Sequence, residues 1–256
     1  MPAKIIAITN QKGGVGKTTT AVNTSAVLSD AGMKVLLIDL DPQANATMGS
    51  GVNKEKIKNS VYEALIGLED LASIIIETNF GYDLLPSNRE LIGADLDLVD
   101  VEEREYRLKA GLQSIESNYD YIIIDCPPSL SLLTLNGLCA SNGVLIPMQC
   151  EYFALEGLSD LIKSVRVVHS NFNANLSKIG LLRVMFDPRV TLSQDVSAQL
   201  IEHFGSKVFS TIIPKNVRLA EAPSHGLPVT VYDSKSRGSM AYKAFGEELI
   251  NRYNPI

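Results

Sequence analysis

A glycine-rich stretch at residues 11–19 carries the residue types that bind a phosphate chain. The apolar run at residues 5–8 before it predicts a buried strand, and residues 21–28 after it predict a helix. Glycines let backbone N–H groups converge on an anion, and the start of a helix adds partial positive charge. In such a loop Lys17 reaches the β- and γ-phosphates, and the Thr18 hydroxyl binds Mg²⁺. The loop residues expected to hold a nucleotide are Lys12, Gly13, Gly14, Val15, Gly16, Lys17, Thr18 and Thr19.

The loop departs from the common pattern G-x-x-x-x-G-K-[ST] at its first position, where Gln11 replaces glycine, and it carries a second lysine, Lys12. A glycine-rich turn with incidental lysines is the alternative, and the strand–turn–helix context argues against it. With Lys12 before Gly-Gly-x-Gly-Lys-Thr, the chain resembles the MinD/ParA group of dimerising P-loop ATPases with a deviant Walker A loop. The resemblance implies that Lys12 crosses to the partner subunit's nucleotide and neutralises charge there, as an arginine finger does.

Asp41 follows a second predicted strand, residues 34–39. Carboxylates at the C-terminal end of a parallel strand point into the crevice where α/β proteins bind ligands. Near a γ-phosphate, Asp41 would orient a water for attack or hydrogen-bond a magnesium-bound water. A helix cap or turn aspartate before Pro42 is the other interpretation. The sequence Asp-x-Asp-Pro-Gln resembles the ParA group, whose catalytic switch aspartate corresponds to Asp41.

Asp125 ends the apolar run at residues 121–124, which is the Walker B arrangement. Such a carboxylate reaches Mg²⁺ mostly through water, because this ion keeps several of its waters. A strand-ending aspartate is weak evidence alone, but here three predicted strand ends converge on one ion–phosphate pair. The expected magnesium ligands are Thr18 directly, and Asp125 and Asp41 through water.

Helices and strands alternate along the whole chain, with no linker, internal repeat or low-complexity segment. This alternation predicts one α/β domain over residues 1–256, a doubly wound, mostly parallel sheet flanked by helices. A charged, amphipathic helix is expected at residues 102–117. The turn at residues 86–91 resembles a segment of the same group, but its residues alone reveal no chemistry. Further strands are predicted at residues 82–85, 143–147, 179–186 and 208–213.

The composition fits a protein with a sizeable core, because 45% of the 256 residues are hydrophobic and 20% are charged. No apolar run is long enough to cross a bilayer, and no signal-peptide pattern precedes the first strand. The three cysteines, Cys126, Cys139 and Cys150, lack a C-x-x-C pair and read as reduced buried thiols. We therefore expect a cytoplasmic protein without stable membrane association.

Pro214 and Asn216 follow the last predicted strand, so they lie on the ligand-binding edge. In related ATPases this segment borders the adenine, and the resemblance implies that these two residues contact the base. A proline turn with an asparagine helix cap is the alternative. Residues 219–226 and 232–238 closely resemble the Soj branch of the ParA proteins, so the resemblance covers essentially the entire chain.

The net charge of −6 argues against indiscriminate nucleic-acid binding by the whole surface. The charge is uneven, since residues 178–256 hold ten Lys/Arg and seven Asp/Glu. Scattered basic residues usually form a solvated surface. In Soj-like proteins, however, arginines matching Arg189 and Arg218 help to bind DNA through phosphate contacts that weaken with salt. The expected DNA-contacting residues are Arg189, Lys215, Arg218, Lys235 and Arg237.

The resemblance implies an ATP-dependent partitioning ATPase of the ParA/Soj type. ATP and Mg²⁺ would bind at the loop, two subunits would close face to face, and the homodimer would bind double-stranded DNA nonspecifically on the nucleoid. Slow hydrolysis, stimulated by a ParB-type centromere-binding partner, would release the DNA. Chromosome and plasmid both remain open as cargo.

Two relatives with other functions are the alternatives. A MinD-type regulator of cell division carries a basic amphipathic C-terminal helix that inserts into lipid, whereas residues 241–256 include Glu247 and Glu248 and few bulky apolar side chains. An iron–sulfur protein like the nitrogenase iron protein would need four ligands, and one cysteine per subunit, such as Cys126, supplies only two. With no N-terminal helix-turn-helix region expected, specific operator binding is not predicted either.

Overall fold

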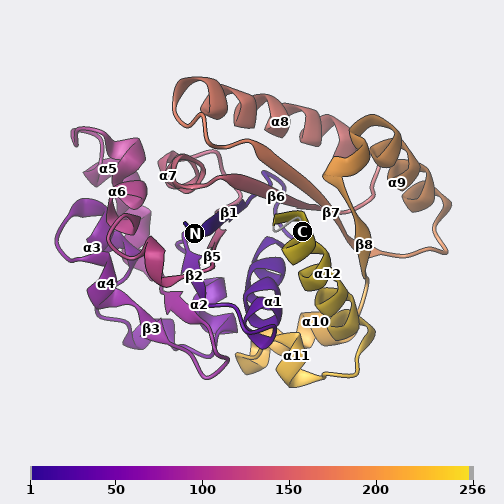
Figure 1. Cartoon of the computed structure of the whole chain (residues 1–256), viewed down its shortest axis with the longest axis horizontal. Helices are drawn as coiled ribbons and strands as arrows, with labels where there is room; N and C mark the ends of the chain where they lie inside the picture. Colours follow the sequence, from indigo (N-terminus) through magenta and orange to yellow (C-terminus); the bar gives the residue numbers. More distant parts are fainter. Residues whose placement is uncertain (1, 254–256) are drawn as a thin grey trace.

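One sheet runs through the part of the chain that the computed structural model describes, residues 2–253 (Figure 1). Its strands are β1 (Lys4–Ile8), β2 (Val35–Asp39), β3 (Ile76–Glu77), β4 (Asp83–Leu85), β5 (Tyr121–Asp125), β6 (Gly143–Met148), β7 (Lys178–Phe186) and β8 (Val208–Pro214). Within the described residues these eight strands are ordered β3-β4-β2-β5-β1-β6-β7-β8. Every neighbouring pair is parallel except β3–β4. The predicted doubly wound, mostly parallel sheet is confirmed.

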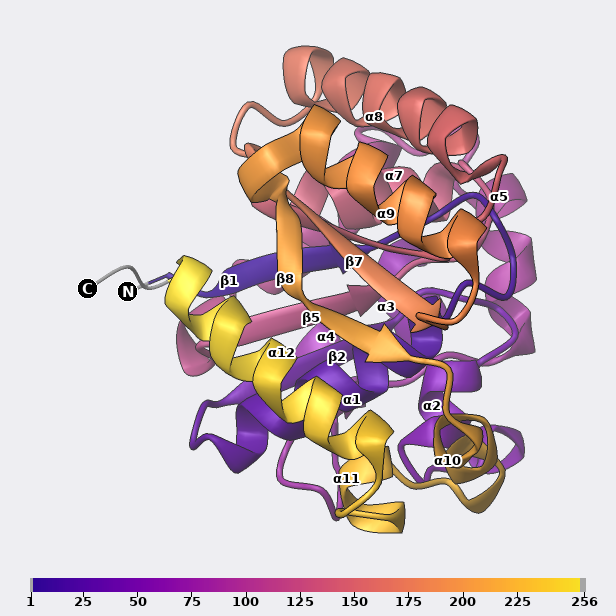
Figure 2. The ribbon, with the colours of Figure 1, turned by 90° about the vertical axis from the view of Figure 1, so that its right-hand side faces the viewer.

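Helices cover both faces of this sheet (Figures 1 and 2). They are α1 (Lys17–Asp30), α2 (Asn45–Gly49), α3 (Val61–Ile66), α4 (Leu71–Ile74), α5 (Ala94–Asp97), α6 (Arg107–Leu112), α7 (Leu132–Ala140), α8 (Ala154–Asn171), α9 (Thr191–Phe204), α10 (Val217–Glu221), α11 (Val229–Tyr232) and α12 (Arg237–Tyr253). One face carries α3 to α9, and the other carries α1, α2, α11 and α12. Figure 2 shows α12 alongside α1 and β8. Short 3₁₀ turns lie at Lys54–Lys56, Arg89–Gly93, Arg104–Tyr106, Glu116–Asn118, Gly205–Lys207 and Ala222–His225.

The central strands are apolar on both sides because both faces of the sheet are covered. In β5, Ile122 and Ile124 pack with the helices of one face, and Tyr121 and Ile123 pack with those of the other. Successive side chains of a strand point to opposite faces, so an unbroken apolar run fills two cores at once. This explains why the short run at residues 121–124 is a strand at the centre of the sheet.

The carboxyl ends of β1, β2 and β5 meet at one edge of the sheet. Strand β5 lies between the other two, and its register places Asp125 opposite Ile8 on β1 and Asp39 on β2. The loops that leave β1 and β2 therefore start beside Asp125. The structure brings the three predicted strand ends together at this edge.

The helix expected at residues 102–117 is wrong in extent. Only α6, Arg107–Leu112, is α-helical there, with a 3₁₀ turn on each side. Glu103 has a φ of +53°, a left-handed conformation that a continuous helix cannot contain. Amphipathic spacing gives no signal of such a local backbone reversal.

Candidate nucleotide-binding site

The loop between β1 and α1 has the backbone of an anion cradle. Gly14 and Gly16 have φ values of +74° and +76°, which strongly favour glycine. The backbone N–H groups of residues 13–16 make no hydrogen bond with any described residue. Helix α1 begins directly afterwards at Lys17, and the first N–H groups of a helix also lack partners within it. These donors and the helix start together suit a phosphate group.

Lys17 is buried beside this cradle, with 7% of its surface exposed. Its Nζ donates to the carbonyl oxygen of Lys12 at 3.4 Å. Burial lowers the pKa of Lys17, and the carboxylates of Asp125 and Asp41 oppose that effect by favouring the charged form. The ammonium group of Lys17 therefore lies near two carboxylates, those of Asp125 and Asp41, beside the loop that suits a phosphate group.

Asp125 is the least satisfied polar group of the site. Both of its carboxylate oxygens are buried and have no hydrogen-bond partner among residues 2–253. Burial raises the pKa of Asp125, as does Asp39 on the neighbouring strand, while the nearby Thr18 hydroxyl and Lys17 oppose the rise. A buried carboxylate without partners is costly, and a hydrated cation would supply the missing partners. The unpartnered oxygens of Asp125 therefore fit Mg²⁺.

The protein offers few other ligands to such an ion. No group of three His, Cys, Asp or Glu side chains within residues 2–253 is placed to bind a metal. A magnesium ion usually keeps several waters and takes one or two carboxylates together with substrate phosphates. The sparse donor set around Asp125 and Thr18 is consistent with that mode of binding.

Asp41 lies at the start of the loop that leaves β2, and it is 9% exposed. Its backbone N–H donates to Asp39 Oδ1 at 3.1 Å, and its own Oδ1 accepts from the backbone N–H of Gln43 at 2.9 Å. Oδ2 makes no hydrogen bond within the described chain. Asp41 is thus a turn aspartate, as the alternative had it, and also presents an acceptor at the ligand edge.

Asp39 is a site residue that the sequence did not single out. It is completely buried and accepts from the backbone N–H and the hydroxyl of Thr47, at 2.7 and 2.8 Å. Burial raises the pKa of Asp39 to about 6, against the opposing effect of these hydrogen bonds. The available signal was an aspartate at the end of an apolar strand, the same signal that indicated Asp125.

Lys12 lies at the exposed rim of the cradle. Its Nζ is 2.5 Å from Oε2 of Glu151, and the two side chains are 55% and 52% exposed. Beside this pair, Gln149 donates from Nε2 to the carbonyl oxygen of Gly14 at 3.3 Å. Glu151 and Gln149 were not predicted, because nothing in the local sequence places the segment after β6 against the loop after β1.

A cavity of about 340 Å³ adjoins the cradle on the side of β7 and β8. Gly16 and Thr19 of the loop and helix α1 line it, together with Pro214 and Asn216. The Asn216 side chain also caps α10, accepting from the backbone N–H of Arg218 at 2.9 Å. Both interpretations of Asn216 are therefore compatible with its position. The remaining lining residues are Val184, Met185, Ile213, Lys215, Val217, Leu219, Ala220 and Tyr242.

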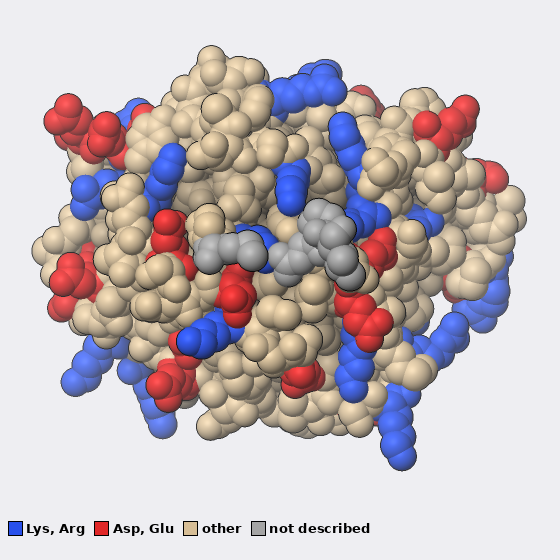
Figure 3. Space-filling model, viewed as in Figure 1, with Lys and Arg blue, Asp and Glu red and all other residues tan. Residues whose placement is uncertain are grey.

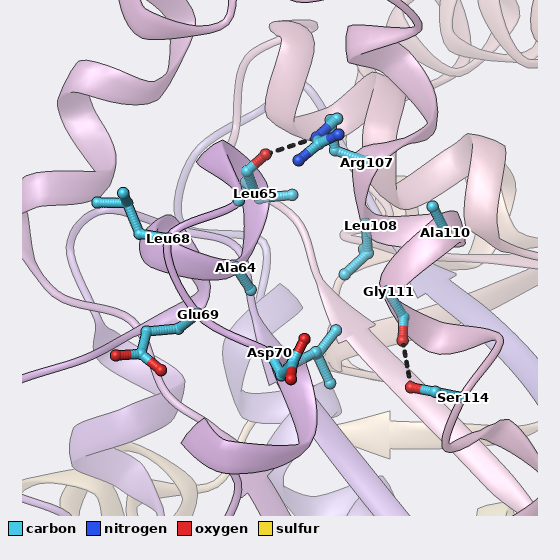
Figure 4. A pocket seen from close by; sticks show the side chains of 12 residues that line it. Ala64, Leu65, Leu68, Glu69, Asp70, Arg107, Leu108, Ala110, Gly111 and Ser114 are labelled. Carbon is cyan, nitrogen blue, oxygen red and sulfur yellow. Dashed lines mark hydrogen bonds between the residues drawn. The ribbon is translucent and has the colours of Figure 1, made fainter.

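A second cavity, of about 530 Å³, lies between α3, α4 and α6 (Figure 4). Arg107 is its basic residue, and its Nε already donates to the carbonyl oxygen of Leu65 at 2.8 Å. Glu69 and Asp70 add negative charge to the lining. None of the lining residues belongs to the glycine-rich loop, so this cavity lacks the features that suit a phosphate chain.

Comparisons with known proteins agree with this geometry. A family model described as an AAA domain matches residues 3–178. The sporulation initiation inhibitor protein Soj of Bacillus subtilis is 51% identical over 247 residues, covering 96% of this chain and 98% of that protein. The chain belongs to the ParA/Soj family of partitioning ATPases. Another member, the chromosome partitioning protein ParA of Myxococcus xanthus, is 46% identical over 98% of this chain and 89% of its own length.

The fold of this ParA/Soj family member also recurs among solved structures. A cobyrinic acid a,c-diamide synthase from Mycobacterium smegmatis, solved with an ATP analogue and magnesium, has a TM-score of 0.87. It is 36% identical over 98% of this chain and 96% of its own. That protein is named as a synthase and not as a partitioning protein. Its sequence identity to this chain, 36%, is lower than the 51% and 46% of Soj and ParA. The shared fold therefore does not decide the function by itself.

The five basic residues expected to contact DNA are all exposed. Arg189 forms an ion pair with Asp187, with Nη2 2.7 Å from Oδ2. Arg218 pairs with Glu221 at 2.8 Å and with Asp233 at 3.3 Å. Figure 3 shows basic and acidic side chains interspersed over the face turned to the viewer. Two of the expected DNA contacts are thus partly neutralised by the chain's own carboxylates.

The three cysteines are buried and free, as expected. Burial raises the pKa of the Cys150 thiol to about 11 and that of Cys139 to about 12. Burial also raises the pKa of Cys126, with a further contribution from Asp125. All three side chains are buried, so none is presented at the surface, where a cluster shared between two subunits would need its ligands. This argues against the iron–sulfur alternative.

Proposed function

We propose that the chain is an ATP-dependent partitioning ATPase that dimerises on ATP, binds double-stranded DNA nonspecifically as a dimer and releases it on hydrolysis. The observation that carries the proposal is the combination of the free N–H groups of residues 13–16, the buried Lys17 and the unpartnered Asp125. A triphosphate with its metal ion satisfies all three. Residues 1–256 would act as one P-loop ATPase domain.

ATP would lie along the edge from the cradle to the cavity beside β8. Residues 12–19 hold the phosphates, and Pro214 and Asn216 border the adenine. Thr18 directly, and Asp125 and Asp41 through water, hold Mg²⁺, which when bound neutralises negative charge on the phosphate oxygens. The relative solved with an ATP analogue and magnesium supports this choice of nucleotide and ion.

Hydrolysis would depend on Asp41 and Lys17. The free Oδ2 of Asp41 accepts a hydrogen bond from the attacking water and orients it toward the γ-phosphate. Burial lowers the pKa of Lys17, and Asp125 and Asp41 oppose this by favouring its ammonium form, which stabilises the charge that develops on the phosphate oxygens.

Dimerisation would use Lys12. Its side chain is exposed at the rim, and its ion pair with Glu151 is of the solvent-exposed kind that contributes at most about 1 kcal/mol. A partner's triphosphate would compete for Lys12 effectively, because it carries several negative charges. Lys12 then neutralises charge on that nucleotide in the way an arginine finger does.

DNA binding would follow from dimerisation. One subunit offers Arg189, Lys215, Arg218, Lys235 and Arg237, of which two are partly neutralised. Two linked copies meet twice as many backbone phosphates, and the second set binds at a high effective concentration. A ParB-type partner would stimulate hydrolysis and release the DNA on the nucleoid.

A membrane-bound MinD-type role is less favoured because of α12. Its apolar residues Tyr242, Phe245 and Leu249 are at most 1% exposed and pack into the core against α1 and the sheet. Insertion of α12 into lipid would therefore require the core to open. Among residues 2–253, no helix combines the length and the apolar composition that crossing a bilayer requires. ATP-dependent sedimentation with anionic liposomes would favour the MinD-type role.

The test is a comparison of oligomeric state and DNA binding in the nucleotide-free, ADP-bound and nonhydrolysable-ATP-bound protein. We expect a dimer and DNA binding only with the ATP analogue, with affinity falling steeply between two salt concentrations. A protein that stays monomeric when saturated with the analogue would overturn the proposed switch.

A further inference from the structure

The turn at residues 86–88 contacts the loop of Asp41, although 46 positions separate Ser87 from Asp41. Ser87 is completely buried, and its hydroxyl donates to the carbonyl oxygen of Asp41 at 2.8 Å. Its backbone N–H donates to Oγ1 of Thr47 at 2.9 Å. Ser87 thus contacts both the loop of Asp41 and helix α2 behind it, without belonging to the glycine-rich loop.

Thr47 and Asp39 close these contacts into a ring. The Thr47 hydroxyl accepts from Ser87 and donates to Asp39 Oδ2 at 2.8 Å. The other oxygen of Asp39, Oδ1, accepts from the backbone N–H of Asp41 at 3.1 Å. The hydrogen bonds therefore run from Asp41 to Asp39, Thr47 and Ser87, and back to Asp41. All four residues are buried, so water competes little for these bonds.

The ring leaves one atom of Asp41 available. The Asp41 N–H donates to Asp39, its carbonyl oxygen accepts from the Ser87 hydroxyl and from the backbone N–H of Ala44, and Oδ1 accepts from the backbone N–H of Gln43. Oδ2 makes no hydrogen bond within residues 2–253. We propose that Ser87 and Thr47 are positioning residues that hold the peptide of Asp41 so that Oδ2 points at the water of ATP hydrolysis. This inference rests on the proposed function, because it assumes that Asp41 orients that water.

The outer side of the turn is anchored to α3. Pro86 accepts from the backbone N–H of Val61 at 2.9 Å, and Asn88 Oδ1 accepts from the Ser60 hydroxyl at 3.2 Å. Ser60 begins α3 in a capping box with Glu63. Ser87 is therefore held from both sides, which is what a positioning group needs to keep a neighbour's geometry fixed.

Two substitutions remove ring hydroxyls with little change of shape, Ser87→Ala and Thr47→Val. Thr47→Ser retains the hydroxyl and is the rescue variant. Ser141→Ala is the matched control, because Ser141 is also buried and its hydroxyl donates to a backbone carbonyl, that of Gly137 at 2.6 Å, away from the site. Each variant is compared with wild type for thermal stability, affinity for a fluorescent ATP analogue and single-turnover ATP hydrolysis.

We expect Ser87→Ala and Thr47→Val to bind the analogue as wild type does but to hydrolyse ATP on the order of 10- to 100-fold more slowly, the loss that a misplaced reactive group causes. Thr47→Ser should retain most of the rate. Ser141→Ala should lose stability without losing rate. Wild-type hydrolysis in Ser87→Ala and Thr47→Val would overturn the proposal, as would a loss of rate in Ser141→Ala that matches theirs.

Asp41→Ala, measured in parallel, separates this inference from the proposed function. If Asp41→Ala is inactive while both ring variants are active, the ring has no positioning role and the proposed function stands. If Asp41→Ala hydrolyses ATP at the wild-type rate, the assigned role of Asp41 is wrong, and the ring has no catalytic group to position.

Discussion

Lys12 and Glu151 are joined by an ion pair at the mouth of the phosphate cradle, with Nζ 2.5 Å from Oε2, although 139 positions separate them in the chain. Lys12 is the lysine that the family resemblance assigns to the partner's nucleotide, and this contact holds it within its own subunit. If Lys12 crosses to the partner's nucleotide as proposed, it must first break this pair with Glu151, and the pair would then oppose dimerisation.

Glu151→Gln should strengthen dimerisation. Without the charge on residue 151, Lys12 no longer leaves an ion pair. Each dimer breaks two such pairs, and because an exposed pair contributes at most about 1 kcal/mol, the dissociation constant of the dimer should fall up to about 30-fold. Analytical ultracentrifugation with a nonhydrolysable ATP analogue measures this. Asp160→Asn, which breaks the exposed pair with Lys163 on α8, is the control and should have no effect. A weaker dimer in Glu151→Gln would contradict the prediction.

Lys17 and Lys12 should separate nucleotide binding from dimerisation. Lys17→Ala removes the buried ammonium group that is proposed to face the phosphates, and it should abolish ATP binding. Lys12→Ala removes an exposed group at the rim, so it should leave ATP binding intact and prevent the dimer. Titration calorimetry followed by size-exclusion chromatography tests both. Equal loss of ATP binding in the two variants would refute the distinct role of Lys12.

Arg218 and Glu221 should affect DNA binding in opposite directions. Arg218→Glu replaces the proposed phosphate contact with a repulsive charge and should weaken DNA binding by the ATP-bound protein, while dimerisation persists. Glu221→Gln removes the carboxylate 2.8 Å from Arg218 and should strengthen binding at low salt. Fluorescence anisotropy with a random-sequence duplex measures both. Unchanged binding by Arg218→Glu at low salt would remove Arg218 from the DNA-binding surface.

The thiols should make the protein less stable at alkaline pH. Burial raises the pKa of Cys150 from 9.0 to about 11, so the folded protein keeps a proton that the unfolded chain loses. The stability that this proton provides is complete below pH 9 and is lost as the pH rises toward 11. Urea unfolding at a series of pH values measures the trend, and Cys150→Ser should reduce the slope.

A thiol reagent at pH 8 should label the unfolded chain only, and rapid labelling of the folded protein would contradict the burial of the three thiols.

The glycine-rich loop, Asp41, Asp125 and the parallel sheet could be predicted because each depends on a local pattern. An apolar run that ends in an aspartate marks a buried strand with its carboxylate at the ligand edge, whatever surrounds it. Glycine spacing likewise indicates a phosphate loop, since the backbone conformations at Gly14 and Gly16 are set within a few residues. Local signals failed at residues 102–117, where the reversed backbone of Glu103 interrupts an amphipathic pattern.

The tertiary structure alone decided which residues surround these groups. The pairing of β2 with β5 sets Asp39 beside Asp125, and the return of the chain through β4 carries Ser87 to the loop of Asp41. The segment after β6 carries Glu151 to Lys12 in the same way. These contacts depend on strand order and register between segments far apart in the chain. The spacing of side chains within one segment cannot predict them, because the folded backbone determines which distant residues lie next to a buried polar group.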